Sequence, residues 1–168
     1  TRAALTTTGT VVLDIRDPKS YATGHITGAL NAPYGTWRGP EGNPGELPSL
    51  ENLTKLVQRL GLTPDSKVIV TSSGKDATDF GAAARVYWTL KVLGLKELSV
   101  LNGGLKAWQA AGFDLNTQPV TAAASTYVPT INQSMIATRA EVVSSVQSGK
   151  AQLIDARPTA FFDGSTRH

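Results

Sequence analysis

The chain has 168 residues, of which 40% are hydrophobic and 17% are charged, so it can bury one α/β core but is too short for two complete domains. The formal net charge of +3 is modest and the lysines and arginines stand singly, which argues against a nucleic-acid-binding or polybasic membrane surface. No apolar run reaches the roughly 18 residues that a membrane span needs. The absence of cysteine excludes disulfides, thiolate nucleophiles and cysteine metal sites within this sequence.

Short apolar runs alternate with amphipathic stretches along the first two thirds of the chain. The apolar runs predict strands at residues 11–15, 67–71 and 98–101. The amphipathic stretches predict helices over residues 50–60, 80–93 and 105–111. Ser49 is the expected N-cap of the first helix, and a glycine follows each helix as its stop signal. Strands that alternate with helices predict a parallel sheet covered on both faces.

This alternation ends after residue 113. Gln118-Pro119, three consecutive alanines and Val128-Pro129 are typical of a linker. Thr138 and Glu141 then have the spacing of a capping box for a helix to about residue 146, and residues 152–156 are expected to open a second sheet. The expected organisation is a first domain at 1–117, a linker at 118–134 and the beginning of a second domain at 135–168.

A short pattern near the start of the chain returns near its end. Asp14-x-Arg16 follows the first expected strand, and Asp155-x-Arg157 follows residues that resemble it, each with an aromatic residue shortly afterwards. The repetition indicates a tandem repeat of which only the opening part of the second copy is present. Residues from about 134 onward are therefore expected to be ordered only beside the rest of that second domain, held as a separate fragment after cleavage near His168.

The polar residues of the first copy are interpreted as structural. Asp14 and Arg16 stand at a strand end where α/β proteins often place functional groups, but their recurrence favours a charge-assisted pair that fixes the next turn. His25 lies beside glycines with no nearby Ser, Cys or second ligand, so we interpret it as a hydrogen-bonded turn residue rather than a base. Because the other histidine is His168, no histidine-based metal site is expected.

The segment from Ser72 to Asp79 is the best candidate for a binding site. It joins an expected strand to an expected helix, whose first N–H groups lack partners within the helix and attract anions. The segment matches neither a P-loop nor a nucleophile elbow, and neither serine has a visible base. We predict an anion site made by the residues of this loop, namely Ser72, Ser73, Gly74, Lys75 and Thr78.

Three segments, in this order, resemble the rhodanese family of sulfurtransferases. They are Leu13–Arg16, Gly24–Ala29, where the family usually reads Gly-His-Ile-Pro-Gly-Ala, and Val100–Trp108, where Gly103, Gly104 and Trp108 fit the family's Leu-Asp-Gly-Gly-x-x-x-Trp. The departures, Thr27 for proline and Asn102 for aspartate, are mild. The resemblance covers Val11 to about Phe113 and implies a three-layer α/β domain with a mostly parallel central sheet flanked by helices.

The resemblance also implies where a catalytic cysteine would stand. The family places this cysteine in the loop after the second predicted strand, cradled by backbone N–H groups, where it carries sulfane sulfur as a persulfide. The matching residue here is Ser72, and a hydroxyl cannot replace the thiol because its far higher pKa leaves almost no anion at pH 7. We therefore expect no catalytic residue in this chain and no thiosulfate:cyanide sulfurtransferase activity from it alone. Arg85-x-x-Trp88 in the following helix resembles the silent first domains of tandem rhodaneses.

What the resemblance implies for the intact protein is transfer of sulfane sulfur from thiosulfate or a similar small-molecule donor to cyanide or a thiol. The reaction would need no cofactor, and its cysteine would lie in a second rhodanese domain, which would be the partner of this chain. The alternative is a non-catalytic rhodanese-like module that binds an anion or a partner for regulation. A cysteine in the active loop of the second domain would discriminate between them.

A third possibility, a phosphatase on the same fold, is disfavoured because the loop lacks both the cysteine and the arginine that it needs. We expect neither nucleic acid nor membrane as a partner. The missing initiator methionine and the low Lys and Glu content favour a periplasmic over a cytoplasmic location.

Overall fold

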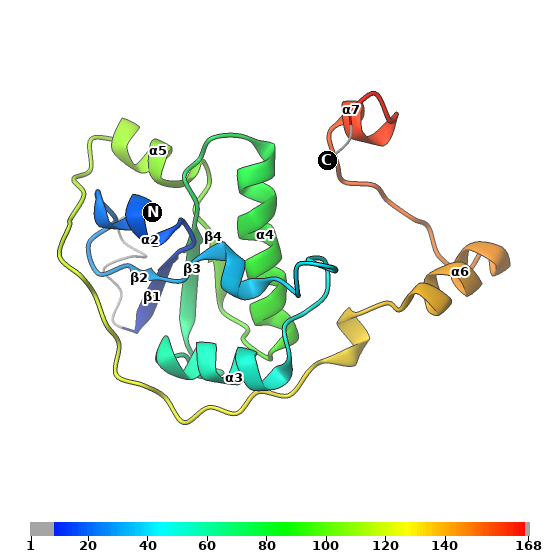
Figure 1. Cartoon of the computed structure of the whole chain (residues 1–168), viewed down its shortest axis with the longest axis horizontal. Coiled ribbons are helices and arrows are strands. Elements are labelled where there is room, and N and C mark those ends of the chain that lie inside the picture. Colours follow the sequence, from blue (N-terminus) through cyan, green and yellow to red (C-terminus); the bar gives the residue numbers. More distant parts are fainter. Residues whose placement is uncertain (1–8, 167–168) are drawn as a thin grey trace. The chain divides into compact units, whose positions relative to one another are not determined.

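The computed structural model describes residues 9–166, which form two compact units, one ending at Ile131 and the other beginning at Asn132 (Figure 1). The first unit contains the sheet and the candidate site. The second contains only helical segments among its described residues: η2 (Gln133–Met135), α6 (Arg139–Ser148) and α7 (Thr159–Phe162). No helix within residues 9–166 is long and apolar enough to cross a membrane.

A four-stranded sheet forms the centre of the first unit, in the order β2-β1-β3-β4. All three pairings are parallel, and Val12 of β1 lies opposite Ile69 of β3. The strands are β1 (Thr10–Asp14), β2 (Leu30–Asn31), β3 (Lys67–Thr71) and β4 (Leu98–Val100), and the helices of this unit are α2 (Pro18–Ala22), η1 (Tyr34–Trp37), α3 (Leu50–Arg59), α4 (Ala77–Val92) and α5 (Gly104–Ala110). The predicted α/β class with a parallel sheet and flanking helices is confirmed.

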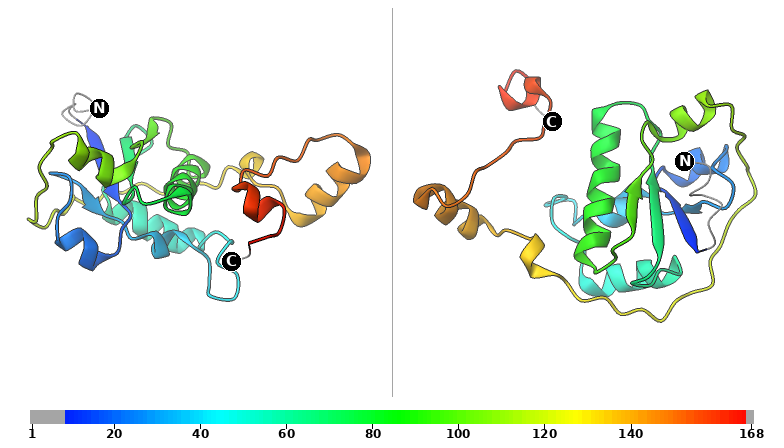
Figure 2. Two further views of the ribbon diagram at one scale, coloured as in Figure 1. Left: turned by 90° about the horizontal axis from the view of Figure 1, so that it is seen from above. Right: turned by 180° about the vertical axis from the view of Figure 1, so that it is seen from behind.

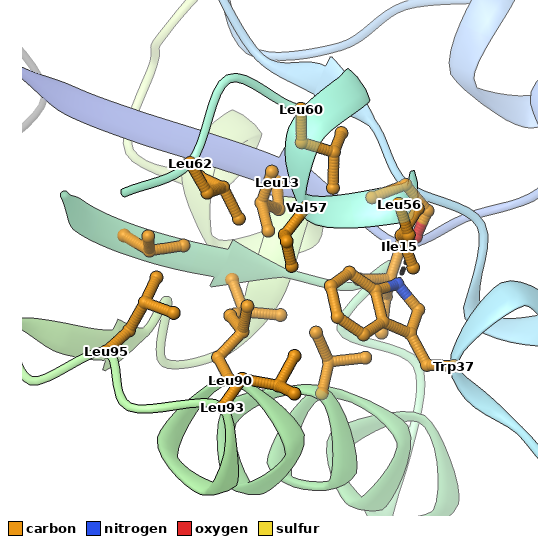
Figure 3. Close-up of a cluster of buried hydrophobic side chains, with 14 of the residues drawn as sticks. Leu13, Ile15, Trp37, Leu56, Val57, Leu60, Leu62, Leu90, Leu93 and Leu95 are labelled. Carbon is orange, nitrogen blue, oxygen red and sulfur yellow. Dashed lines mark hydrogen bonds between the residues drawn. The ribbon is translucent and has the colours of Figure 1, made fainter. Parts of the chain in front are cut away.

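Alternating residues of β1 and β3 supply the two halves of the core, because successive side chains of a strand point to opposite faces. Leu13, Val68 and Val70 pack against α3, α4 and the fully buried Trp37 in one cluster (Figure 3). The indole Nε1 of Trp37 donates to the Ala32 carbonyl at 3.1 Å. On the other face, Val12 and Ile69 pack with Leu105 of α5, so the sheet is covered on both sides (Figure 2).

Capping residues explain where the two long helices begin. The Ser49 hydroxyl accepts from the Asn52 N–H, which starts α3 where the sequence predicts. The apolar pattern predicts the start of α4 at residue 80, which is wrong. Asp76 caps it by accepting from the Asp79 N–H at 2.9 Å, so the helix begins at Ala77 and includes Asp79 in its first turn. This difference matters for the candidate site.

The stretch from 118 to 131 has no helix or strand, but it packs against the first unit. Tyr127 Oη donates to the Leu93 carbonyl, Ser125 Oγ donates to the Leu62 carbonyl at 2.6 Å, and Gln58 Nε2 donates to the Tyr127 carbonyl at 3.0 Å. Apolar side chains of the stretch, Val120, Ala122, Tyr127 and Ile131, contact the larger core cluster. This part of the predicted linker therefore belongs to the surface of the first unit.

The strand expected at residues 152–156 is wrong, because these residues form neither helix nor strand. Leu153 and Ile154 are 60% and 82% exposed. A strand needs a neighbouring strand to satisfy its backbone, and the described residues of the second unit offer none. The capping box before them is present: Thr138 Oγ1 accepts from the Glu141 N–H, and Glu141 Oε2 accepts from the Thr138 N–H.

Candidate functional site

The loop between β3 and α4 lies at the carboxyl end of the sheet, beside the start of α5 (Figure 1). Open α/β sheets bind ligands at this edge, where the strands end and the helices begin. A cleft of about 280 Å³ opens there, lined by the loop with the first turn of α4 on one side and by Leu101–Gly104 on the other. The structure thus brings the predicted site segment together with the Gly103-Gly104 pair.

Glycine–glycine packing holds the backbone of this loop in place. A Cβ built on Gly74 would lie 1.9 Å from the Gly103 carbonyl oxygen, and one built on Gly104 would lie 2.6 Å from the Ser72 carbonyl oxygen. The Leu105 N–H also donates to the Ser72 carbonyl at 2.9 Å, and the Lys106 N–H to the Ser73 carbonyl at 3.0 Å. No other residue type fits at Gly74 and Gly104, so the two loops form one rigid assembly.

The donors of the loop converge on one internal carboxylate, that of Asp79. Its Oδ1 accepts from the hydroxyl of Ser73 at 3.0 Å and from the Ser73 N–H at 3.4 Å. Its Oδ2 accepts from the Gly74 N–H at 2.6 Å and from the Lys75 N–H at 3.2 Å. The loop is therefore shaped around an anion, and that anion belongs to the chain itself.

The charge of Asp79 is stabilised where it lies. Partial burial raises the pKa of its carboxyl, but the hydrogen bonds from Ser72, Gly74, Ser73 and Lys75 outweigh this effect, so the pKa lies below the ordinary aspartate value of 3.8. Hydrogen bonds to a charged acceptor are stronger than those between neutral groups. Asp79 is ionised at neutral pH and neutralises the positive potential of the loop's N–H groups.

Of the residues predicted for an anion site, Ser72, Ser73, Gly74 and Lys75 surround Asp79, while Thr78 is an exposed residue of α4 outside this set of hydrogen bonds. Ser72, the residue directly after β3, is buried. Sequence reasoning missed the role of Asp79. The spacing of Asp76 and Asp79 is a visible signal, because the side chain of an acid three residues after an N-cap reaches back toward the N–H groups at and before the cap.

The buried pair of Asp14 and Arg16 lies at the end of β1. The carboxylate of Asp14 is fully buried and accepts from Arg16 Nε at 3.0 Å and from Arg16 Nη2 at 2.6 Å. The same guanidinium donates to the Ser20 carbonyl at 3.2 Å and to the Gly24 carbonyl at 2.7 Å. The pair thus ties the strand end to α2 and the turn after it, and the Asn31 side chain donates to the backbone carbonyls of both residues at 3.2 and 2.9 Å.

His25 lies in the interior, away from solvent. Its ring stacks on Tyr21 with centroids 3.8 Å apart and planes 6° from parallel. Nδ1 lies 3.1 Å from the Tyr21 carbonyl oxygen and Nε2 lies 3.1 Å from the Gln118 carbonyl oxygen. The backbone of His25 also forms an antiparallel bridge with Asn116. Both ring nitrogens face carbonyl oxygens, so His25 connects the segment after α5 to α2. Neither nitrogen is free to act as a base.

Arg85 and Trp108 also anchor loops. Arg85 donates to the carbonyls of Gly45 and Glu46 at 2.9 and 3.0 Å, and its guanidinium lies 5.0 Å from the Trp88 ring centroid. Burial lowers the pKa of Arg85. Trp108 Nε1 donates to the Asp114 carbonyl at 3.1 Å. Within residues 9–166, no group of three acidic or histidine side chains lies close enough to hold a metal ion.

Comparison with known proteins relates this geometry to a family. The rhodanese-like domain family matches residues 2–111. A relative from Synechococcus elongatus is 32% identical over 156 residues, which cover 91% of this chain and 47% of that protein. The thiosulfate sulfurtransferase of Gallus gallus is 31% identical over 119 residues, which cover 71% of this chain and 40% of that enzyme.

Among solved structures, the rhodanese-fold 3-mercaptopyruvate sulfotransferase SseA of Escherichia coli superposes with a TM-score of 0.80 at 24% identity, over 98% of this chain and 65% of that one. This likeness concerns the fold. The chain spans about half the length of the curated relatives it matches, and those relatives include sulfurtransferases. From its fold, its family match over most of the first unit and these relatives, the chain belongs to the rhodanese-like domain family.

Proposed function

We propose that this chain is the catalytically silent rhodanese-like part of a tandem sulfurtransferase. The observation that carries the proposal is the β3–α4 loop, in which Ser72 stands at the position of the family's cysteine and Asp79 takes the N–H groups that would hold an anionic sulfur. A serine hydroxyl is not ionised at neutral pH and cannot accept a sulfane sulfur. The sulfur-carrying cysteine would lie in a second domain.

In the proposed reaction, the thiolate of that second domain attacks the outer sulfur of thiosulfate or a similar donor, and sulfite leaves. Cyanide or a protein thiol then attacks the outer sulfur of the persulfide and restores the thiolate. This chain would supply structure rather than chemistry: a rigid sheet, a loop with its charge neutralised, and the repeated Asp-x-Arg turn that opens the second copy at Asp155. Support comes from the sulfurtransferases among the relatives, about twice as long as this chain.

The experiment is a thiocyanate assay with thiosulfate and cyanide on two samples. The purified 168-residue chain is expected to release thiocyanate at the buffer rate. The complete natural product, if it carries a second rhodanese domain, is expected to be active, and a Cys→Ser change in the active loop of that domain is expected to abolish the activity. Thiocyanate release by the pure chain above background would contradict the proposal. A complete product without a cysteine in that loop would instead favour the regulatory, anion- or partner-binding module.

A further inference from the structure

We propose that Asp79 is the resident anion of the β3–α4 loop and that it keeps inorganic oxyanions and a loaded sulfur out of this domain. The silence of the domain would then have two independent causes, the serine at position 72 and the carboxylate at position 79. The inference rests on the proposed function only for the identity of the sulfur donor, because occupancy of the loop is a property of this chain alone.

The donors of the loop are already used. Four hydrogen bonds, from Ser73 N–H, Ser73 Oγ, Gly74 N–H and Lys75 N–H, reach the two oxygens of Asp79 at 2.6–3.4 Å. An N–H that points at one acceptor is not available to a second one. A sulfate or thiosulfate ion must therefore displace the carboxylate before it can bind these donors.

The backbone of Asp79 is also fixed, which keeps its carboxylate beside the loop. Asp79 lies in the first turn of α4, a 16-residue helix, and its own N–H donates to Asp76 Oδ1 at 2.9 Å. A group tethered beside its binding site competes as an intramolecular ligand, at an effective concentration of about millimolar for a short flexible tether and more for a well-oriented group. The first turn of α4 thus holds a carboxylate beside the loop, where it competes with any dissolved anion for the same N–H groups.

Removal of the carboxylate would leave the donors facing an open cleft. The loop backbone would keep its shape, because Gly74 and Gly104 fix it through contacts that do not involve Asp79. The adjoining cleft of about 280 Å³ has room for several groups the size of a water molecule, which occupies about 30 Å³. N–H groups without a partner in such a place favour an oxyanion.

A cysteine introduced at position 72 would meet the same carboxylate. With Asp79 in place, a thiolate would lie beside a carboxylate that holds the same donors, and like charges raise the pKa of the thiol. Without Asp79, the donors would stabilise the thiolate. That thiolate could attack the outer sulfur of thiosulfate, forming a cysteine S–S bond while the S–S bond of thiosulfate breaks and sulfite leaves with the electron pair.

The binding test uses the full 168-residue chain and NMR of the Gly74 and Lys75 amides, titrated with sulfate or thiosulfate. Asp79→Ala is expected to give saturable shifts with a dissociation constant at least about tenfold lower than that of the wild type. Asp65→Ala, which removes an exposed charge from a turn distant in sequence, is the matched control and is expected to behave like the wild type. Asp79→Asn, which keeps the side-chain volume, serves if Asp79→Ala does not fold.

Two results would overturn the binding claim: saturation of the wild type at the same concentration as Asp79→Ala, or no saturation of either Asp79 variant.

The sulfur test compares Ser72→Cys with Ser72→Cys/Asp79→Ala after incubation with thiosulfate, by intact mass. A gain of one sulfur atom is expected in the double variant only. Equal loading of both, or of neither, contradicts the proposal. Activity of the wild-type chain would refute the proposed function but leave the binding result unaffected, so the two failures are distinguishable.

Discussion

The carboxylate of Asp14 is completely buried, and Arg16 is its charged partner, with Arg16 Nη2 2.6 Å from Asp14 Oδ2. Taking away one member of a buried ion pair leaves the other charge without compensation, which costs more than the pair itself contributes. Arg16→Ala is therefore expected to lower the free energy of unfolding by about 3–5 kcal/mol, measured by urea denaturation followed by circular dichroism.

The chain contains its own control for this prediction. Arg157 and Asp155 repeat the arrangement, with Nη2 2.6 Å from Oδ2, but the side chains are 54% and 27% exposed. The hydrogen bonds from Arg157 lower the pKa of Asp155 to about 2, yet solvent screens this pair. Arg157→Ala is expected to leave the unfolding of the first unit unchanged. Equal losses for the two substitutions would refute burial as the cause.

A second prediction concerns the contact between the two glycine loops. Gly74 and Gly28 both have φ of +81°, but a Cβ on Gly74 would strike the Gly103 carbonyl whereas a Cβ on Gly28 would meet nothing within 4 Å. Gly28→Ala should thus pay only the cost of a left-handed backbone, about 1–2 kcal/mol. Gly74→Ala should cost at least about 2 kcal/mol more, since backbone must move. Thermal or urea unfolding of both variants would measure the difference, and similar costs would show that the loops separate easily.

The third prediction is a pH dependence. Because the folded-state pKa of Asp79 lies below its ordinary value of 3.8, the ionised carboxylate adds stability above that value, and this stability is lost as the pH falls through the folded-state pKa. The wild type should exceed Asp79→Asn in unfolding free energy by a constant amount from about pH 7 to 5, and the gap should narrow below about pH 4. Urea titrations at each pH would measure it, with Asp65→Asn as the control. A difference in unfolding free energy that does not change with pH would contradict the claim that ionised Asp79 stabilises the fold.

The fourth prediction tests whether residues 118–131 belong to the first unit. Tyr127 is half-buried, burial raises the pKa of its hydroxyl, and that hydroxyl donates to Leu93. Tyr127→Phe is expected to cost about 1 kcal/mol through the lost hydrogen bond, and Tyr127→Ala about 3 kcal/mol. The neighbouring Val128 is 67% exposed, so Val128→Ala should change stability by less than about 0.5 kcal/mol. A neutral Tyr127→Ala would mean that the segment is only loosely attached.

Sequence patterns predicted most of the strands and helices, because hydrophobic runs and capping residues determine these elements locally. The strands at Val11 and Val68 were predicted from apolar, β-branched runs, and the α3 cap at Ser49 from its hydroxyl. The two-residue strand β2 was missed because Leu30 and Asn31 gain strand geometry only from pairing with β1. The strand expected at Ile154 does not form for the opposite reason: its sequence suits a strand, but among the described residues it has no neighbouring strand to pair with.

The sequence indicates where the candidate site lies, but it does not indicate that the Asp79 carboxylate binds the N–H groups of the loop. The strand-to-helix junction and the Gly103-Gly104 pair mark the loop in the sequence. The hydrogen bonds of Asp79 depend on where α4 starts, and the N-cap at Asp76 moves that start by one turn relative to the apolar pattern. Helix boundaries are the least reliable part of sequence-based prediction. The chemistry of this site depends on one such boundary.

The contacts of Gly74 and Gly104 separate the architecture of the loop from its reactivity. Since main-chain packing holds the loop, the side chain at position 72 is not needed to maintain its shape. Replacement of a nucleophile at such a position would remove a reaction while the protein continues to fold. It would also leave several amide N–H groups of the loop without an anion to bind. In this chain the carboxylate of Asp79, in the first turn of α4, meets that electrostatic demand, because it accepts from the N–H groups of Gly74 and Lys75.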